Sequence, residues 1–237
     1  AANGINAVWL PALLYTLTPW LGDIELSARW QERRKRLRDL AQRARKYGIR
    51  LFLYLNEPRM APGRAFLHHP QWRGAKLKGR DVYTMCPNGE GMLEAFRRGI
   101  DDLCRAVPEL GGFLTITMSE NWTHCLSRER SELDSPCPRC ASVDSPAGHV
   151  AAILQAIVRG MQHAGSGMEL IAWNWAWDPA WDREVVEALP PQVRIMCVSE
   201  NSLPTNCRGI AGVVHDYSIS QVGPGPTAQR LWQIARE

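Results

Sequence analysis

Several features that mark other classes of protein are missing from this sequence. The net charge is +4 over 237 residues, which is too small a bias to require nucleic acid as a partner. No run approaches the roughly 18 apolar residues of a membrane span, and no signal peptide opens the chain. A Gly-x-Gly-x-x-Gly turn is also absent, which argues against a dinucleotide-binding sheet. We therefore expect a soluble protein without a nucleic-acid or membrane partner.

Basic residues gather in one segment. Ten of the 28 Lys and Arg side chains lie between Arg29 and Arg50. A surface that binds nucleic acid commonly combines such charge with aromatic side chains, and this segment has no aromatic array. We interpret the segment as the solvated outer side of a helix.

The composition is that of an ordinary globular protein, with 45% apolar and 22% charged residues. The length allows one large domain and lies near the roughly 250 residues of a (β/α)8 barrel. Ten tryptophans are several times the usual number for such a chain. Seven cysteines are an odd number, which excludes a fully paired disulfide scaffold. We expect one aromatic-rich domain over residues 1–237.

Short apolar runs alternate with amphipathic segments along the chain. The runs read as strands buried on both faces, at residues 7–10, 51–55, 112–118, 170–175, 194–198 and 212–215. Helical patterns lie at 37–47, 96–107, 153–161, 181–189 and 227–236. This alternation predicts an α/β protein with a parallel sheet, and its spacing favours a (β/α)8 TIM-type barrel. About six βα units are present where eight are needed, so the predicted barrel is incomplete.

Carboxylates follow five successive predicted strands: Glu57, Glu120, Asp178, Glu200 and Asp216. In TIM-type barrels the catalytic groups lie at the carboxyl ends of strands, so these side chains would meet at one mouth. Each carboxylate alone is as well explained by a solvated strand end or a helix cap. Five in a row, with aromatic neighbours, favour a site with acidic catalysts.

Two carboxylates that face each other across a barrel mouth are what glycoside hydrolysis requires. One donates a proton to the leaving oxygen, and the other stays ionised as a nucleophile or as a base for water. Tryptophan supports this interpretation, because its flat ring suits the C–H face of a sugar and its N–H can donate to a hydroxyl. The candidates are Trp122, Trp173, Trp175 and Trp177, and we expect some of them to pack in the core instead.

Short motifs give a resemblance to known enzymes. Asn3-Gly4 precedes the first predicted strand, and the run that begins at Gly112-Phe113 ends in Ser119-Glu120. This pattern resembles the TIM barrels of family-20 hexosaminidases and family-67 alpha-glucuronidases. In the latter family a Ser-Glu pair at the end of the fourth strand carries the general acid, which implies that role for Glu120.

The resemblance also has a limit. Family-20 enzymes carry an Asp-Glu pair, and this chain has Ser119 in the place of the Asp. Substrate-assisted cleavage of an N-acetyl sugar is therefore not implied. The segment 217–226 is similar to segments of uncharacterised bacterial proteins related to these enzymes. We expect a location in the cytoplasm or periplasm of a bacterium.

The predicted function is hydrolysis of O-glycosyl bonds in an oligo- or polysaccharide, with carbohydrate as the partner. Glu120 is the expected general acid, and Asp216 or Glu200 is its ionised partner. No cofactor is required for catalysis. Substrate contacts are expected from other side chains near the mouth: Glu57, Arg59, Trp122, His124, Trp173, Trp175, Trp177, Asp178 and Tyr217. Arg59 would suit an acidic sugar, because guanidinium pairs with carboxylate through two hydrogen bonds. The alternatives are a non-catalytic carbohydrate-binding barrel and a fragment of a larger enzyme.

Cysteines gather in the segment 121–147, which we expect to be a Cys-rich loop. Cys137-Pro-Arg-Cys140 is a Cys-x-x-Cys, and two thiolates at this spacing suit one edge of a tetrahedral zinc. Cys125, with either His124 or Cys86, would complete the site. Such a zinc would fasten the loop and have no open position for catalysis. A disulfide, a redox pair and free thiols are the alternatives.

Overall fold

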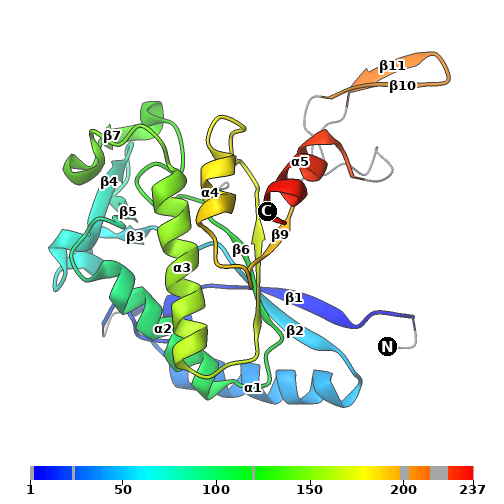
Figure 1. The fold of residues 1–237 in the computed structure, drawn as a ribbon. Helices are drawn as coiled ribbons and strands as arrows, with labels where there is room; N and C mark the ends of the chain where they lie inside the picture. Colours follow the sequence, from blue (N-terminus) through cyan, green and yellow to red (C-terminus); the bar gives the residue numbers. More distant parts are fainter. Residues whose placement is uncertain (1–2, 23–24, 119–120, 198–202, 214–223, 237) are drawn as a thin grey trace.

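The fold was analysed in a computed structural model, which describes residues 3–22, 25–118, 121–197, 203–213 and 224–236. A five-stranded sheet forms its centre (Figure 1). The strands are β1 (Ala7–Ala12), β2 (Arg50–Leu55), β6 (Gly112–Ile116), β8 (Glu169–Trp173) and β9 (Arg194–Met196). They lie side by side in chain order, and every neighbouring pair is parallel. The predicted α/β class with a parallel sheet is confirmed.

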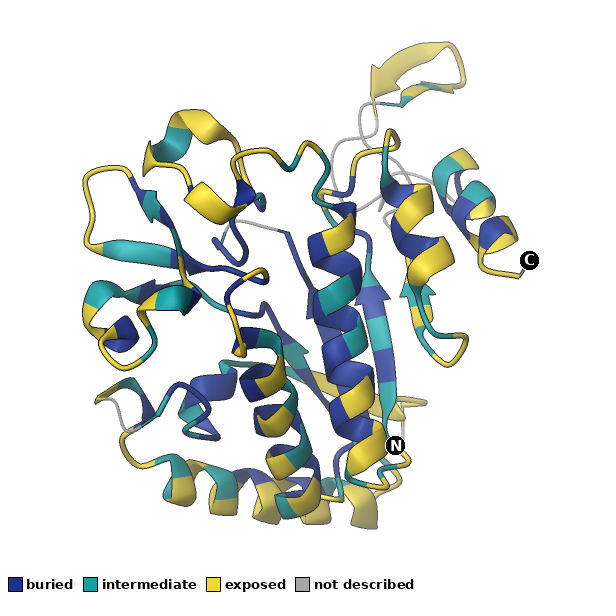
Figure 2. Cartoon of the chain, turned by 60° about the vertical axis from the view of Figure 1, so that its left-hand side comes forward, coloured by how far each residue is buried: buried dark blue, intermediate teal, exposed yellow. Residues whose placement is uncertain are grey.

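Helices cover one face of the sheet, and α1 to α4 lie in the chain between its successive strands (Figures 1 and 2). They are α1 (Trp30–Lys46), α2 (Met92–Ala106), α3 (Ala147–His163), α4 (Asp182–Ala188) and α5 (Pro226–Ile234). On the covered face, Leu53 of β2, Phe113 of β6 and Leu170 of β8 lie in one row across the sheet, each at most 1% exposed. The main core cluster includes all three and runs from Leu14 to Ile234. Burial of this apolar row drives the packing of the helices on the sheet.

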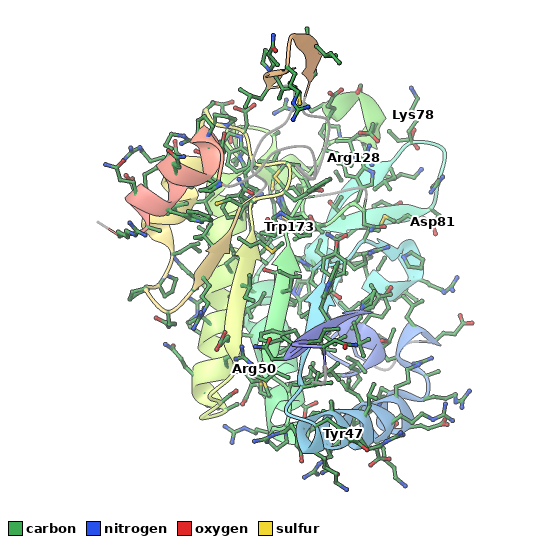
Figure 3. All side chains as sticks on the ribbon, turned by 90° about the vertical axis from the view of Figure 1, so that its right-hand side faces the viewer. Tyr47, Arg50, Lys78, Asp81, Arg128 and Trp173 are labelled. Carbon is green, nitrogen blue, oxygen red and sulfur yellow. The ribbon has the colours of Figure 1, made fainter. Side chains whose placement is uncertain are left out.

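The opposite face of the sheet is also apolar. Tyr54, Leu114 and Ile171 form one row across it, because they are paired in register on β2, β6 and β8. This face is turned toward the viewer in Figure 3, with β8 in front of α3. Two large side chains at its edges are strongly exposed, Trp9 at 50% and Met196 at 39%. No described helix packs on this face, although Leu114 and Ile116 at its centre are only 6% and 4% exposed.

The predicted strand at 212–215 is not part of the main sheet within the described residues. Its first part belongs to β11 (Ile210–Val213), which pairs antiparallel with β10 (Pro204–Cys207) in an exposed hairpin (Figure 2). Arg208 and Gly209 at the turn both have positive φ, 53° and 89°, as the two central residues of a type I′ hairpin turn require. The amide of Gly209 also donates to Asn206 Oδ1 at 2.8 Å. Local turn chemistry therefore overrides the apolar run, and the described main sheet has five of the six predicted strands.

A second, antiparallel sheet lies on one side of the main sheet and was not predicted. Its strand order is β3 (Ala61–Pro62), β5 (Val82–Met85), β4 (Arg73–Leu77) and β7 (Leu133–Ser135). Three of these strands come from the segment between β2 and α2, and β7 comes from the predicted Cys-rich loop after β6. We call this unit the small sheet. It joins two excursions, the segment between β2 and α2 and the segment between β6 and α3. Both leave neighbouring strands of the main sheet at their carboxyl ends.

Short 3-10 helices complete the described elements. They cover Leu14–Thr16, Glu25–Ser27, Gly63–Phe66, Pro70–Trp72, Arg130–Glu132 and Pro138–Cys140. Among the helices that the structure describes, none has both the length and the apolarity needed to cross a bilayer.

Candidate functional site

Four cysteine sulfurs converge beneath the small sheet, and we call them the cysteine cluster. The Sγ atoms of Cys86, Cys125, Cys137 and Cys140 all lie within 4.8 Å of one another, and each residue is at most 3% exposed. Cys86 Sγ is 3.6 Å from Cys137 Sγ and 3.7 Å from Cys140 Sγ. Four ligands at a Zn–S distance of 2.3 Å lie about 3.8 Å apart in a tetrahedron. The cluster can therefore hold a metal such as zinc, and Cys86 rather than His124 is placed to be the fourth ligand.

Three separate segments bring these sulfurs together. Cys86 follows β5 directly, and Cys125 lies in the loop after β6. The two segments are joined where Met85 pairs with His124, and the amide of Met85 donates to Thr123 O at 3.0 Å. The Cys-x-x-Cys supplies the other two sulfurs on either side of a tight turn, in which the amide of Cys140 donates to Cys137 O at 3.0 Å. All seven cysteines are described and none forms a disulfide.

The surroundings of the cluster fit a group of thiolates. Arg139 Nε lies 3.4 Å from Cys86 Sγ, and its Nη2 donates to Arg73 O at 2.6 Å, which fixes the guanidinium beside the sulfurs. Such donors stabilise negative charge on metal-bound sulfur. The backbone also passes very close, because a Cβ on Gly74 would lie 2.6 Å from Cys125 Sγ. Position 74 therefore tolerates only glycine, because any larger side chain would collide with the sulfur of Cys125.

Two of the four thiols are shifted toward ionisation, whereas hydrogen bonds with Cys137 and Cys86 raise the pKa of Cys125 and of Cys140. Hydrogen bonds from the thiols of Cys125, Cys137 and Cys140 hold the pKa of Cys86 well below that of an ordinary thiol. Hydrogen bonds also lower the pKa of Cys137 to about 7, that from Cys125 contributing most. Because thiolates, not thiols, bind metals, the cluster holds two sulfurs poised for ligation at neutral pH.

Two buried histidines lie next to the cluster. His149 Nε2 is 3.7 Å from Cys140 Sγ, and the ring of His149 meets that of His124 edge to face with centroids 5.4 Å apart. His124 is fully buried, and burial lowers its pKa to about 3. Its Nδ1 accepts the amide hydrogen of Leu126 at 3.3 Å. This places His124, an expected substrate contact, behind the cluster rather than on an open surface.

A second group of polar side chains lies at the carboxyl edge of the main sheet. Glu57 follows β2 and is 2% exposed. Its Oε1 accepts the amide hydrogen of Leu14, and its Oε2 accepts that of Arg59, both at 2.6 Å. The carboxyl group thus ties the segment after β1 to the loop after β2. Burial raises the pKa of the neighbouring Tyr15, and the Glu57 charge raises it further.

Hydrogen bonds continue from this group to the loop after β6. Asn56 Nδ2 donates to Ile116 O at 2.9 Å, at the last residue of β6. Arg59 Nη2 donates to Asn121 Oδ1, and Met60 N donates to Trp122 O at 2.9 Å. We call the hydrogen-bonded residues from Asn56 to Met60, with Leu14, Asn121 and Trp122, the edge network. It joins three successive strands at their carboxyl ends, and Asn121 is the residue that follows Glu120 in the chain.

The expected aromatic contacts fall into two groups. Trp122 and Trp177 are 5% and 7% exposed, and Trp177 Nε1 donates to Thr117 Oγ1 at 3.1 Å, so both pack in the interior. Trp173 and Trp175 are half-buried beside the edge, with ring centroids 5.5 Å apart. Figure 3 shows Trp173 on the face of the main sheet that also carries Leu114 and Ile171. Asp178 is exposed and accepts the amide hydrogen of Ala180 at 2.8 Å, as the cap of a turn.

The three expected catalytic carboxylates, Glu120, Glu200 and Asp216, lie outside the described residues, as does Tyr217. Asn56 and Asn121 were not singled out from the sequence, although both stand next to expected site residues. Their position could have identified them, because Asn56 directly precedes Glu57 and Asn121 directly follows Glu120, and both carboxylates follow predicted strands.

We expect Glu57 to make the stability of the fold depend on pH. Burial outweighs the two amide donors and raises the pKa of Glu57 to about 7. A pKa above that of the unfolded chain stabilises the fold at low pH, and this contribution is lost as the pH rises through the folded-state pKa. Between pH 6 and pH 8, the wild type should lose about 1 kcal/mol of unfolding free energy relative to the Glu57→Gln variant, as measured by urea unfolding. Parallel pH profiles for the two proteins would contradict the raised pKa.

The fold and these sites define an α/β protein with a mostly parallel central sheet and a four-cysteine cluster that can bind metal. No family model matches the chain, and no curated protein matches it either.

Proposed function

We propose that the chain is a glycoside hydrolase whose reaction centre lies at the carboxyl edge of the main sheet. The observation that carries the proposal is the edge network, which joins the loops after β1, β2 and β6 around Glu57 and Arg59. Catalytic groups of α/β barrels are supplied by loops at this edge. The Arg59–Asn121 hydrogen bond anchors the loop directly beside Glu120.

The proposed fold is a (β/α)8 barrel of which this chain supplies part. Two observations support it. The described strands of the main sheet are parallel and follow chain order without the reversal that marks a doubly wound sheet. In addition, the sheet face that carries Tyr54, Leu114 and Ile171 is apolar and has no described helix on it, as expected for the inner face of a barrel.

In the proposed mechanism Glu120 is the general acid and protonates the leaving glycosidic oxygen. Asp216 or Glu200 stays ionised, and either attacks the anomeric carbon or activates a water molecule. A separation of about 5–5.5 Å between the two carboxyl groups gives retention of configuration, and about 6.5–9.5 Å gives inversion. Arg59 and Asn121 act as positioning residues, because their hydrogen bond fixes the loop next to Glu120.

The cysteine cluster is proposed to hold a structural zinc. Four thiolates fill a tetrahedral coordination shell, so the metal would have no open position for a substrate. Bound zinc supplies cross-linking: Cys86 belongs to the excursion after β2, and the other three sulfurs belong to the excursion after β6. The small sheet and both loops of the edge network would thereby be held in one arrangement.

The proposal is tested by hydrolysis of a panel of 4-nitrophenyl glycosides and neutral and acidic polysaccharides, followed by release of nitrophenol or of reducing ends. We expect turnover on at least one member, without added cofactor. A second candidate function is carbohydrate binding without catalysis, which the five strands of the main sheet among the described residues favour over a full eight-stranded barrel. Binding of a glycan without turnover of any panel member would contradict the hydrolase and support that second function.

A further inference from the structure

We propose that a cationic groove beside the edge network binds an anionic saccharide, one that carries carboxylate or sulfate groups. The saccharide class rests on the proposed function, whereas the charge preference rests on the groove alone. The groove has a volume of about 530 Å³, within the range of small-molecule sites. Its lining residues come from the small sheet and from the loops after β2 and β6: Met60, Leu77, Lys78, Arg80, Trp122, Arg128, Ser131 and Glu132.

Positive charge dominates the groove. Lys78, Arg80 and Arg128 stand against one carboxylate, Glu132, and all three cations are exposed. Arg128 Nε pairs with Glu132 Oε1 at 3.0 Å. Within the described part of the chain, Lys78 and Arg80 form no ion pair, so their charges remain for a ligand. The groove thus carries two more positive charges than negative ones.

The chain segments that carry these side chains are held in place. The amide of Lys78 donates to Glu132 O at 3.0 Å, which fixes the turn after β4 against the segment that precedes β7. The guanidinium of Arg128 lies 5.8 Å from the ring centroid of Trp122. Stacking of this kind orients a guanidinium at low entropic cost. In Figure 3, Lys78 and Arg128 lie near the top of the view, and Trp173, the last residue of β8, lies below them toward the centre.

The groove is continuous with the edge network. Met60 and Trp122 line it, and the hydrogen bond from Met60 N to Trp122 O is part of that network. Leu77 and Trp122 are both 5% exposed and provide an apolar floor. A sugar offers C–H groups to such a floor and its acidic substituents to the cations around it. A saccharide bound at the reaction centre could therefore extend into the groove, which would act as a subsite for its acidic residues.

The test compares binding of tetra-galacturonate and a sulfated heparin tetrasaccharide with neutral cellotetraose, by titration calorimetry at low salt. We expect at least one of the two acidic ligands to bind. Cellotetraose should bind at least tenfold more weakly than that acidic ligand. The Lys78→Ala/Arg80→Ala variant should lose at least about tenfold in affinity for the acidic ligand, since even one hydrogen bond to a charged group contributes about a factor of ten. Both residues are exposed at a turn, so the variant should fold as the wild type does.

The matched control is Arg43→Ala/Lys46→Ala, which removes the same charge from the exposed end of α1. It should bind the acidic tetrasaccharide like the wild type. Equal losses in the two double variants, or equal binding of a single-stranded tetranucleotide, would overturn the proposal in favour of non-specific attraction of polyanions. Because binding is measured without turnover, the result is independent of the hydrolase assay. Turnover of neutral glycans only, with no acidic ligand bound, would contradict the proposed groove site without contradicting the proposed hydrolase function.

Discussion

Replacing Cys86 by serine is expected to remove the metal and to destabilise the small sheet. A serine hydroxyl stays protonated and is a poor zinc ligand, so the three remaining sulfurs would bind the metal far more weakly. The loss of zinc affinity should exceed the roughly 10–100-fold that typically follows mutation of residues around the metal ligands. Cys86 is also the only sulfur that joins the excursion after β2 to the other three. Its loss therefore removes a cross-link as well as a ligand.

The measurement is zinc per chain by mass spectrometry, with a thermal melt of each protein. The wild type should carry about one zinc and should melt at a lower temperature after chelation, because structural zinc contributes binding free energy to folding. Cys86→Ser should carry almost none and should not respond to the chelator. Cys207→Ser is the matched control, since Cys207 is exposed and lies outside the cluster. A wild type without stoichiometric metal, or a Cys86→Ser variant with full zinc content, would contradict the structural zinc.

The Glu120→Gln variant is expected to lose about 10²–10⁴-fold in turnover, the usual contribution of a general acid. Glutamine has nearly the same shape as glutamate but cannot donate the proton that the leaving oxygen needs. The loss should be largest for natural glycans, whose leaving groups are poor. It should be smaller for nitrophenyl glycosides, because nitrophenolate leaves without full protonation. This dependence on the leaving group separates an acid catalyst from a residue that only binds substrate.

The control for this variant is Glu129→Gln, which neutralises an exposed carboxylate in the same excursion. Both variants should fold and bind zinc like the wild type. Unchanged turnover of a natural glycan by Glu120→Gln would sink its assignment as the general acid. A uniform loss across all leaving groups would assign Glu120 a binding role instead.

The central sheet could be predicted from the sequence because its strands carry strong local signals. Gly112–Ile116 is buried at every position, and its continuous apolar run is typical of a strand whose side chains are buried on both faces. The helices were predicted on the same basis: Phe96, Ile100 and Leu103 repeat at helical spacing, and each is fully buried. In such segments local pattern and tertiary packing agree.

Long-range pairing could not be predicted in the same way. β4 and β7 of the small sheet are joined across the whole of α2 and β6, and their short, polar sequences carry no periodic signal. Cys86 precedes Cys125 by a long stretch of chain, so spacing alone left it no better a fourth ligand than His124. The burial of Glu57 was also invisible, because the amides that hold it belong to Leu14 and Arg59. These features depend on which segments meet in space.

The central claim is that paired carboxylates at the carboxyl edge of the sheet catalyse glycoside hydrolysis. Its most direct test is the distance between the carboxyl group of Glu120 and those of Glu200 and Asp216 in a crystal structure. We expect one pair at about 5–5.5 Å or at about 6.5–9.5 Å, facing each other across an open cleft. Separations well above about 10 Å for both pairs, or a Glu120 carboxylate closed in a salt bridge, would contradict the claim.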